Sequence, residues 1–70
     1  MSNALPATTA KRFLKRQMGK GVWIAYGTAD AEITGYVLDV TKHSVDVQRQ
    51  DNGEIVAVPL WAITEATEAA

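Results

Sequence analysis

The stretch that decides the fold is residues 32–40, which read Glu-Ile-Thr-Gly-Tyr-Val-Leu-Asp-Val. β-Branched and aromatic residues dominate this run, and that composition is typical of a β-strand. Gly35 stands in its middle, where a glycine indicates a sharp bend or the close approach of another backbone. We therefore predict a long strand that bends near Gly35, with the other elements arranged around it.

Strand signals continue on both sides of this run. Further strands are expected at residues 22–26, 44–50, 55–60 and 61–64. The segment 44–50 alternates apolar and polar residues, which indicates a half-buried strand. Turns are expected at residues 27–30 and 41–43, and residues 65–70 are expected to form a frayed tail. All strands together require an arrangement that hides their edges, such as a strongly bent antiparallel sheet or small barrel.

The dipeptide Asn52-Gly53 predicts the hairpin between the third and fourth strands. Asn-Gly favours a two-residue loop, because both of its residues readily adopt positive φ values. This loop would set Val47 opposite Val58 and Val45 opposite Leu60 on one apolar face. Pro59 lacks a backbone N–H, which argues for an edge or a bend at that point.

A short helix is expected before the strands, at about residues 6–18. Its apolar positions have the spacing of one helical face: Ala10, Phe13, Leu14 and Met18. Thr8 or Thr9 can cap its start, or Pro6 can occupy the first turn. A helix of this length is stabilised mainly by packing its apolar face onto the sheet.

Composition narrows the remaining possibilities. The chain has 70 residues, so we expect a single domain covering residues 1–70. It contains no cysteine and one histidine, which excludes disulfides and a cysteine-based zinc site, and no metal or cofactor is expected. Oligomerisation is then the expected extra support for so small a core. No apolar run is long enough to span a membrane and no signal peptide is evident, so a cytoplasmic protein is expected.

Charge is distributed unevenly along the chain. Residues 1–22 carry five cations and no acid, whereas the remainder carries Lys42 and Arg49 against eight acids, giving charges of +5 and −6. A basic segment on an acidic body can form an anion-binding edge, and it can equally be the solvated face of a helix. SH3-like, Sm-like and OB-type barrels all fit the expected pattern of five short strands, and this pattern does not choose among them.

The order of one helix and five strands, with a glycine midway through the second strand, resembles the Sm-like family, and within it the bacterial Hfq-type RNA chaperones. The resemblance covers about residues 11–66. It rests on Phe13-Leu14 followed by basic residues, on residues 32–37, on residues 40–43 where the family has Phe-Asp-Gln-Tyr, and on residues 60–64 where it has Lys-His-Ala-Ile-Ser.

The resemblance implies a non-catalytic protein that binds single-stranded RNA, in the manner of an RNA chaperone or scaffold. Lys42, His43 and Trp61 would line the RNA pocket, where aromatic rings stack on bases and a cation meets phosphate. Trp61 can instead anchor the core or a subunit contact, and His43 can be a solvated loop residue. The basic helix would add a rim that contacts phosphates, formed by Lys11, Arg12, Lys15 and Arg16.

The resemblance also implies a homo-oligomeric ring of about five to seven copies, closed by head-to-tail contacts between the fourth strand of one copy and the fifth of the next. The residues expected at this interface are Ile55, Ala57, Trp61 and Ile63.

Two other function classes compete with RNA binding. An enzyme is not expected, because His43 is the only histidine and no serine elbow, carboxylate pair or glycine-rich phosphate loop accompanies it. No small-molecule substrate and no membrane partner are expected either. The alternative to RNA binding is an SH3-like protein-interaction or structural assembly module, for instance of a phage particle. Leu60 and Trp61 favour this alternative, because they replace the lysine and histidine of the Hfq-type uridine pocket.

Overall fold

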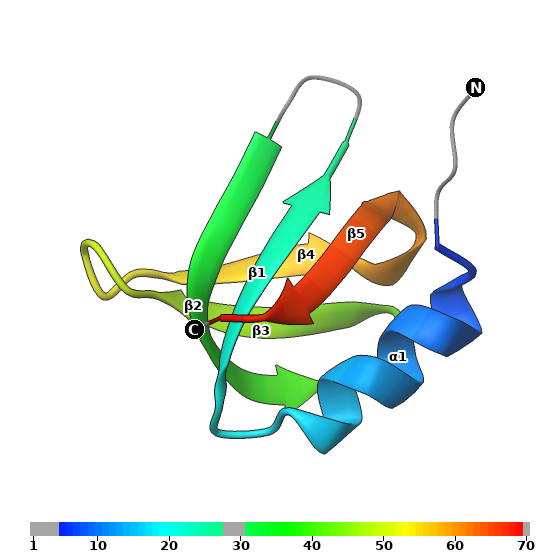
Figure 1. Cartoon of the computed structure of the whole chain (residues 1–70), viewed down its shortest axis with the longest axis horizontal. Helices are drawn as coiled ribbons and strands as arrows, with labels where there is room; N and C mark the ends of the chain where they lie inside the picture. Colours follow the sequence, from blue (N-terminus) through cyan, green and yellow to red (C-terminus); the bar gives the residue numbers. More distant parts are fainter. Residues whose placement is uncertain (1–4, 28–30, 70) are drawn as a thin grey trace.

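One helix and five antiparallel strands make up the part of the chain that the structure describes (Figure 1). The computed structural model describes residues 5–27 and 31–69, so residues 28–30 of the predicted turn 27–30 lie outside the described residues. The mainly-β class with one N-terminal helix is confirmed. The elements in order are α1 (Ala7–Arg16), β1 (Gly21–Tyr26), β2 (Ala31–Val40), β3 (Ser44–Arg49), β4 (Ile55–Pro59), the single 3-10 turn η1 (Leu60–Ala62) and β5 (Ile63–Glu68).

The five strands form one sheet in the order β4-β3-β2-β1-β5. Every neighbouring pair is antiparallel. Within the described residues β4 and β5 each have one neighbour only, so the sheet has two unlike edges and is open rather than closed into a barrel. Each edge leaves a row of backbone N–H and C=O groups without a partner strand.

β2 joins the two halves of the sheet. Its residues 31–36 pair with β1, and its residues 35–40 pair with β3. Figure 1 shows β2 curving between these two partners. A Cβ atom at Gly35 would lie 2.1 Å from the carbonyl oxygen of Gln48 and 2.8 Å from its carbonyl carbon. Only a glycine lets β3 approach this closely, so the close backbone approach expected here is confirmed.

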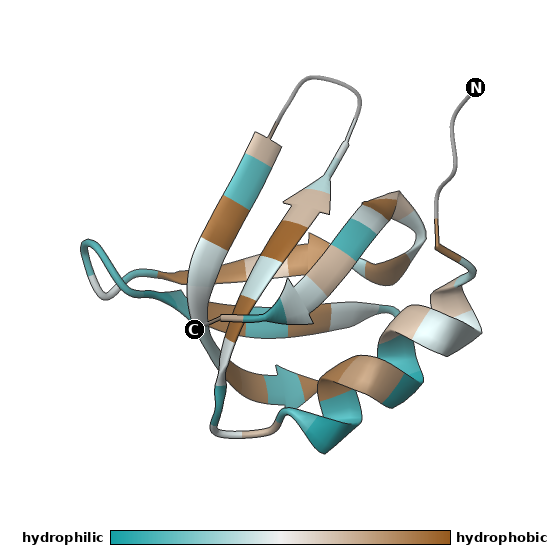
Figure 2. Ribbon diagram, in the orientation of Figure 1, coloured by the Kyte–Doolittle hydropathy of each residue, from teal (hydrophilic) through white to brown (hydrophobic). Residues whose placement is uncertain are grey.

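The core is one cluster of buried apolar side chains from α1, the strands and η1. Apolar and polar residues alternate along β3 (Figure 2), as a half-buried strand requires. From α1 only Ala10 and Leu14 are fully buried, with Phe13 half-buried against them. The buried apolar residues of the strands and of η1 are Val22, Ile24, Ile33, Val37, Val45, Val47, Val58, Leu60 and Ile63.

The helix is shorter than its apolar spacing predicted. It begins at Ala7 with Pro6 as its N-cap residue, so neither a threonine cap nor a first turn containing Pro6 is found, and it ends at Arg16. Gly19, with a φ of +76°, then turns the chain toward β1. Met18 therefore falls outside the helix and is 46% exposed, which corrects its expected place on the packed face. Gln17 is 7% exposed instead, and its amide donates to Glu68 at 3.5 Å.

The β3–β4 hairpin differs from the prediction by a register shift of two residues. Val45 pairs with Val58, and Val47 pairs with Val56. The loop is longer because Arg49 N–H bonds the carbonyl of Glu54 at 2.7 Å, which encloses residues 50–53. Gly53, with a φ of +74°, closes a loop that side chains also support, for example through Asn52 Oδ1, which accepts the N–H of Glu54 at 2.9 Å.

The last strand begins and ends later than expected. Residues 60–62 form η1, and β5 runs from Ile63 to Glu68. The expected frayed tail is therefore wrong over residues 65–68, which pair with residues 22–25 of β1. These residues are held by the ladder with β1 rather than by their own strand propensity, because small and acidic residues are poor strand formers.

Candidate nucleic-acid interface

The turn at residues 41–43 is built around a single hydroxyl group. Thr41 Oγ1 accepts the backbone N–H of Ser44 at 3.0 Å and that of His43 at 3.3 Å. The backbone N–H of Thr41 also donates to the carbonyl of Ser44 at 2.8 Å. These bonds close a tight turn between β2 and β3, and the turn leaves Lys42 and His43 exposed.

Trp61 lies on the second turn of the candidate site, η1. Its neighbour Leu60 is 2% exposed and Ile63 is fully buried, so both hold η1 onto the core. Trp61 itself is 74% exposed, more than any other large apolar residue that the structure describes. Its indole is therefore free to contact a ligand or another copy, and the alternative of a core anchor is wrong.

A backbone hydrogen bond joins the two turns. Leu60 N–H donates to the carbonyl of His43 at 2.9 Å. The structure thus brings His43 next to Leu60, the neighbour of Trp61, although the 16 residues of β3, the hairpin and β4 separate His43 from Leu60 in sequence. A cation, an imidazole and an indole on adjacent exposed turns provide charge for a phosphate and flat surfaces for a base.

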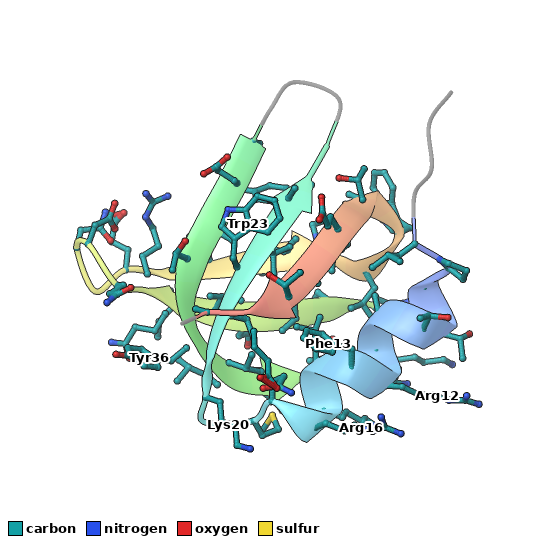
Figure 3. The ribbon with its side chains drawn as sticks, in the orientation of Figure 1. Arg12, Phe13, Arg16, Lys20, Trp23 and Tyr36 are labelled. Atoms are coloured by element: carbon teal, nitrogen blue, oxygen red, sulfur yellow. The ribbon has the colours of Figure 1, made fainter. Side chains whose placement is uncertain are left out.

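The basic residues of α1 form a second exposed surface. Arg12, Lys15 and Arg16 are exposed and Lys11 is half-buried. Figure 3 shows Arg12 and Arg16 directed away from the sheet, while Phe13 lies on the side of α1 that faces it. α1 packs against η1, β2 and β5, so the basic surface and the turn that carries Trp61 belong to one packed unit. Residues 5–22 contain no acid that would neutralise the helix.

The residues expected at a subunit interface occupy different environments. Ile55 is 62% exposed and Ala57 is exposed, and both lie on the open edge strand β4. Ile63 is fully buried in the core, so its side chain has no surface to offer another copy. Its carbonyl accepts the N–H of Leu5 at 3.1 Å.

A pocket of about 440 Å³ lies at the β3–β4 hairpin, apart from the predicted site. It is lined by Glu32, Thr34, Arg49, Gln50 and Asp51. Arg49 forms a two-pronged ion pair with Asp51, with Nη2–Oδ2 and Nε–Oδ1 distances of 2.7 and 2.9 Å. Because the carboxylate accepts these hydrogen bonds, the pKa of Asp51 is lowered, and the same bonds raise the pKa of Arg49. The Arg49 guanidinium is thus already paired with the Asp51 carboxylate.

Sequence reasoning missed the hydroxyl that shapes the site. The sequence predicts a turn at residue 41 and no role for its side chain, whereas Thr41 makes the bonds that define the turn. The signal was present in the sequence, because Thr and Ser hydroxyls commonly bond backbone N–H groups two or three residues later.

No family model matches the chain, and no match was found to a curated protein or to a solved structure. Among the described residues no helix is long and apolar enough to cross a membrane.

Proposed function

We propose that the protein is a non-catalytic, Sm-like ring that binds single-stranded RNA through the adjacent turns at residues 41–43 and 60–62. The observation that carries the proposal is the 2.9 Å hydrogen bond from Leu60 N–H to the His43 carbonyl. It supports a single site made of Lys42, His43 and Trp61. All three side chains are exposed, and the structure describes no side-chain hydrogen bond for any of them, so each can contact a ligand.

The two open edges support assembly into a ring. Ladder bonds alternate along an antiparallel strand. The Arg49–Glu54 bond then directs the backbone groups of Ile55 and Ala57 away from β3, toward solvent. By the same rule the Ala69–Gly21 bond directs the backbone groups of Ala66 and Glu68 away from β1. A β4 edge can therefore pair with the β5 edge of another copy.

A ring would turn a weak site into a useful one. A stacked base contributes roughly 1–3 kcal/mol, and one such interaction gives little affinity by itself. Identical sites held around a common axis can contact the same RNA strand, so that their contributions combine. The basic surface of α1 would add interactions with phosphates that weaken as salt rises.

Native mass measurement tests assembly. The purified chain is expected to form a ring of about five to seven copies at micromolar concentration. Ala57→Pro removes a backbone N–H that points outward, so β4 should survive while pairing with the next copy is prevented. Ala57→Ser, which keeps the N–H, is the matched control and should still assemble. A folded wild-type monomer would count against the ring, as would an Ala57→Pro variant that assembles normally.

Tryptophan fluorescence tests RNA binding. In a Trp23→Phe variant Trp61 is the one remaining tryptophan, and short oligonucleotides are expected to quench it. Lys42→Ala should weaken binding and lower the salt dependence by about 0.7 log units of affinity per log unit of salt for each phosphate that the variant no longer neutralises. Lys42→Arg should retain this neutralisation. If oligo-U, oligo-A and mixed RNA all leave Trp61 unquenched at low salt, the protein-interaction module becomes the better interpretation.

A further inference from the structure

We infer that Thr41 is a positioning residue of this site: its hydroxyl holds the turn in the form that presents Lys42 and His43 to RNA. The inference deepens the proposed function and depends on it. Thr41 itself is not expected to contact the RNA. Its contribution is to fix the turn before binding, so that less conformational freedom is lost when RNA binds.

The hydroxyl has more partners than any other side-chain group of the described residues. Oγ1 lies 3.0 Å from Ser44 N, 3.3 Å from His43 N, 3.1 Å from Ser44 O and 3.0 Å from Ser44 Oγ. A hydroxyl accepts two hydrogen bonds and donates one. It therefore accepts both N–H groups and directs its proton to one of the two oxygens of Ser44.

Nothing else in the turn could replace this network by packing. Residues 41–43 are all exposed, so no buried apolar side chain anchors them. The carbonyl of His43 is already engaged by Leu60 N–H, which fixes the far end of the turn against η1. Lys42 stands between these two fixed points, and its backbone direction follows from them.

Removing the hydroxyl should loosen the turn without unfolding the protein. Valine has the shape and the β-branch of threonine, so Thr41→Val deletes the hydrogen bonds and little else. The pairing of β2 residues 35–40 with β3 residues 45–49 remains, and so does the backbone hydrogen bond between Thr41 and Ser44. The freed N–H groups of His43 and Ser44 lie at an exposed turn, where water can take the place of the hydroxyl.

The test compares Thr41→Val with Thr41→Ser, which keeps the hydroxyl. Binding is measured by fluorescence anisotropy with fluorescein-labelled oligo-U and a mixed-sequence RNA, at matched ring mass. Thr41→Val should weaken binding about fivefold to tenfold, the effect of lost preorganisation, while Thr41→Ser stays within about twofold of the wild type. Amide exchange at Ser44 should be faster in Thr41→Val alone.

A double-mutant cycle separates positioning from general destabilisation. In a Lys42→Ala/His43→Ala background Thr41→Val should have no further effect, because there is nothing left to position. Equal weakening in both backgrounds would overturn the inference, as would Thr41→Val binding like the wild type or Thr41→Ser losing as much as Thr41→Val. If the wild type itself binds neither RNA, the proposed function fails together with this inference. If the wild type binds and Thr41→Val matches it, only the inference fails.

Discussion

Replacing Gly35 with alanine is expected to destabilise the protein strongly, because it pushes β2 and β3 apart. The added Cβ would lie 2.1 Å from Gln48 O and 3.0 Å from Val47 Cγ1. A carbon and a carbonyl oxygen normally approach to no less than about 3.3 Å, so the two backbones must separate by about 1 Å. Neither Gly35 nor Gln48 can relieve the clash by changing a rotamer, because it involves the backbone.

The cost can be estimated from two contributions. Overpacking of this kind costs about 1–3 kcal/mol, and weakening one or two neighbouring ladder bonds costs roughly 1 kcal/mol each. We therefore expect Gly35→Ala to lower the free energy of unfolding by about 2–5 kcal/mol. In a domain of this size each kcal/mol shifts Tm by roughly 4–8 °C, so Tm should fall by about 8–40 °C.

Gly21→Ala is the matched control for this prediction. Gly21 is also a strand glycine, but a Cβ there would meet Ala69 Cβ at 3.5 Å and Tyr36 Cε1 at 4.0 Å, which are ordinary van der Waals distances. Both substitutions reduce the freedom of the unfolded chain equally, so their difference isolates the clash. Thermal unfolding followed by circular dichroism, at one protein concentration, measures both. Equal Tm values for the two variants would refute the reasoning.

Three further predictions concern the core, the exposed turn and the hairpin. Leu14→Ala should lower the free energy of unfolding, measured by chemical denaturation, by about 2–5 kcal/mol, because Leu14 is fully buried. Arg12→Ala on the outer side of α1 should change it by no more than about 0.5 kcal/mol, and similar losses for the two variants would contradict the packing described for α1. Trp61→Ala should leave the unfolding free energy of the isolated chain within about 0.5 kcal/mol, and a larger loss would mean that the indole packs on the subunit. The Arg49–Asp51 pair should stabilise the hairpin at a pH above the pKa of an unfolded aspartate, and this stabilisation should be lost as the pH falls through the lowered pKa of Asp51. A normal or raised pKa of Asp51 in an NMR titration would exclude the pair.

Local patterns predicted most of the elements and of the core. The alternation in β3 predicted that Val45 and Val47 share one apolar face, and both are fully buried. Gly35 was predicted at the bend because a glycine inside a strand has few other roles. These features depend on short-range periodicity, which a sequence displays directly.

The errors arise where distant residues decide the local structure. The hairpin register depended on loop interactions such as that of Asn52 with Glu54. The shift of two residues kept every side chain on its predicted face, so Val58 is still in the core. β5 extends to Glu68 because β1 offers it an edge, and nothing in the composition of residues 65–68 signals this.

The candidate site was predicted in its residues but not in its geometry. The resemblance predicts Lys42, His43 and Trp61 as site residues, and the structure joins their two turns through Leu60 and His43. Trp61 was expected at the start of a strand, yet it lies on η1, between the buried Leu60 and Ile63. Interactions between segments that are so far apart in sequence cannot be read from periodicity.

The two unlike edge strands of the sheet would make assembly head-to-tail, since the β4 edge of one copy would pair with the β5 edge of the next and not with another β4 edge in the same way. A copy with one blocked edge could still bind a growing assembly through its other edge, but no further copy could bind to it. A minority of Ala57→Pro chains, mixed in during refolding, would then terminate assembly and leave incomplete arcs. The share of incomplete assemblies would then be much larger than the share of Ala57→Pro copies in the mixture.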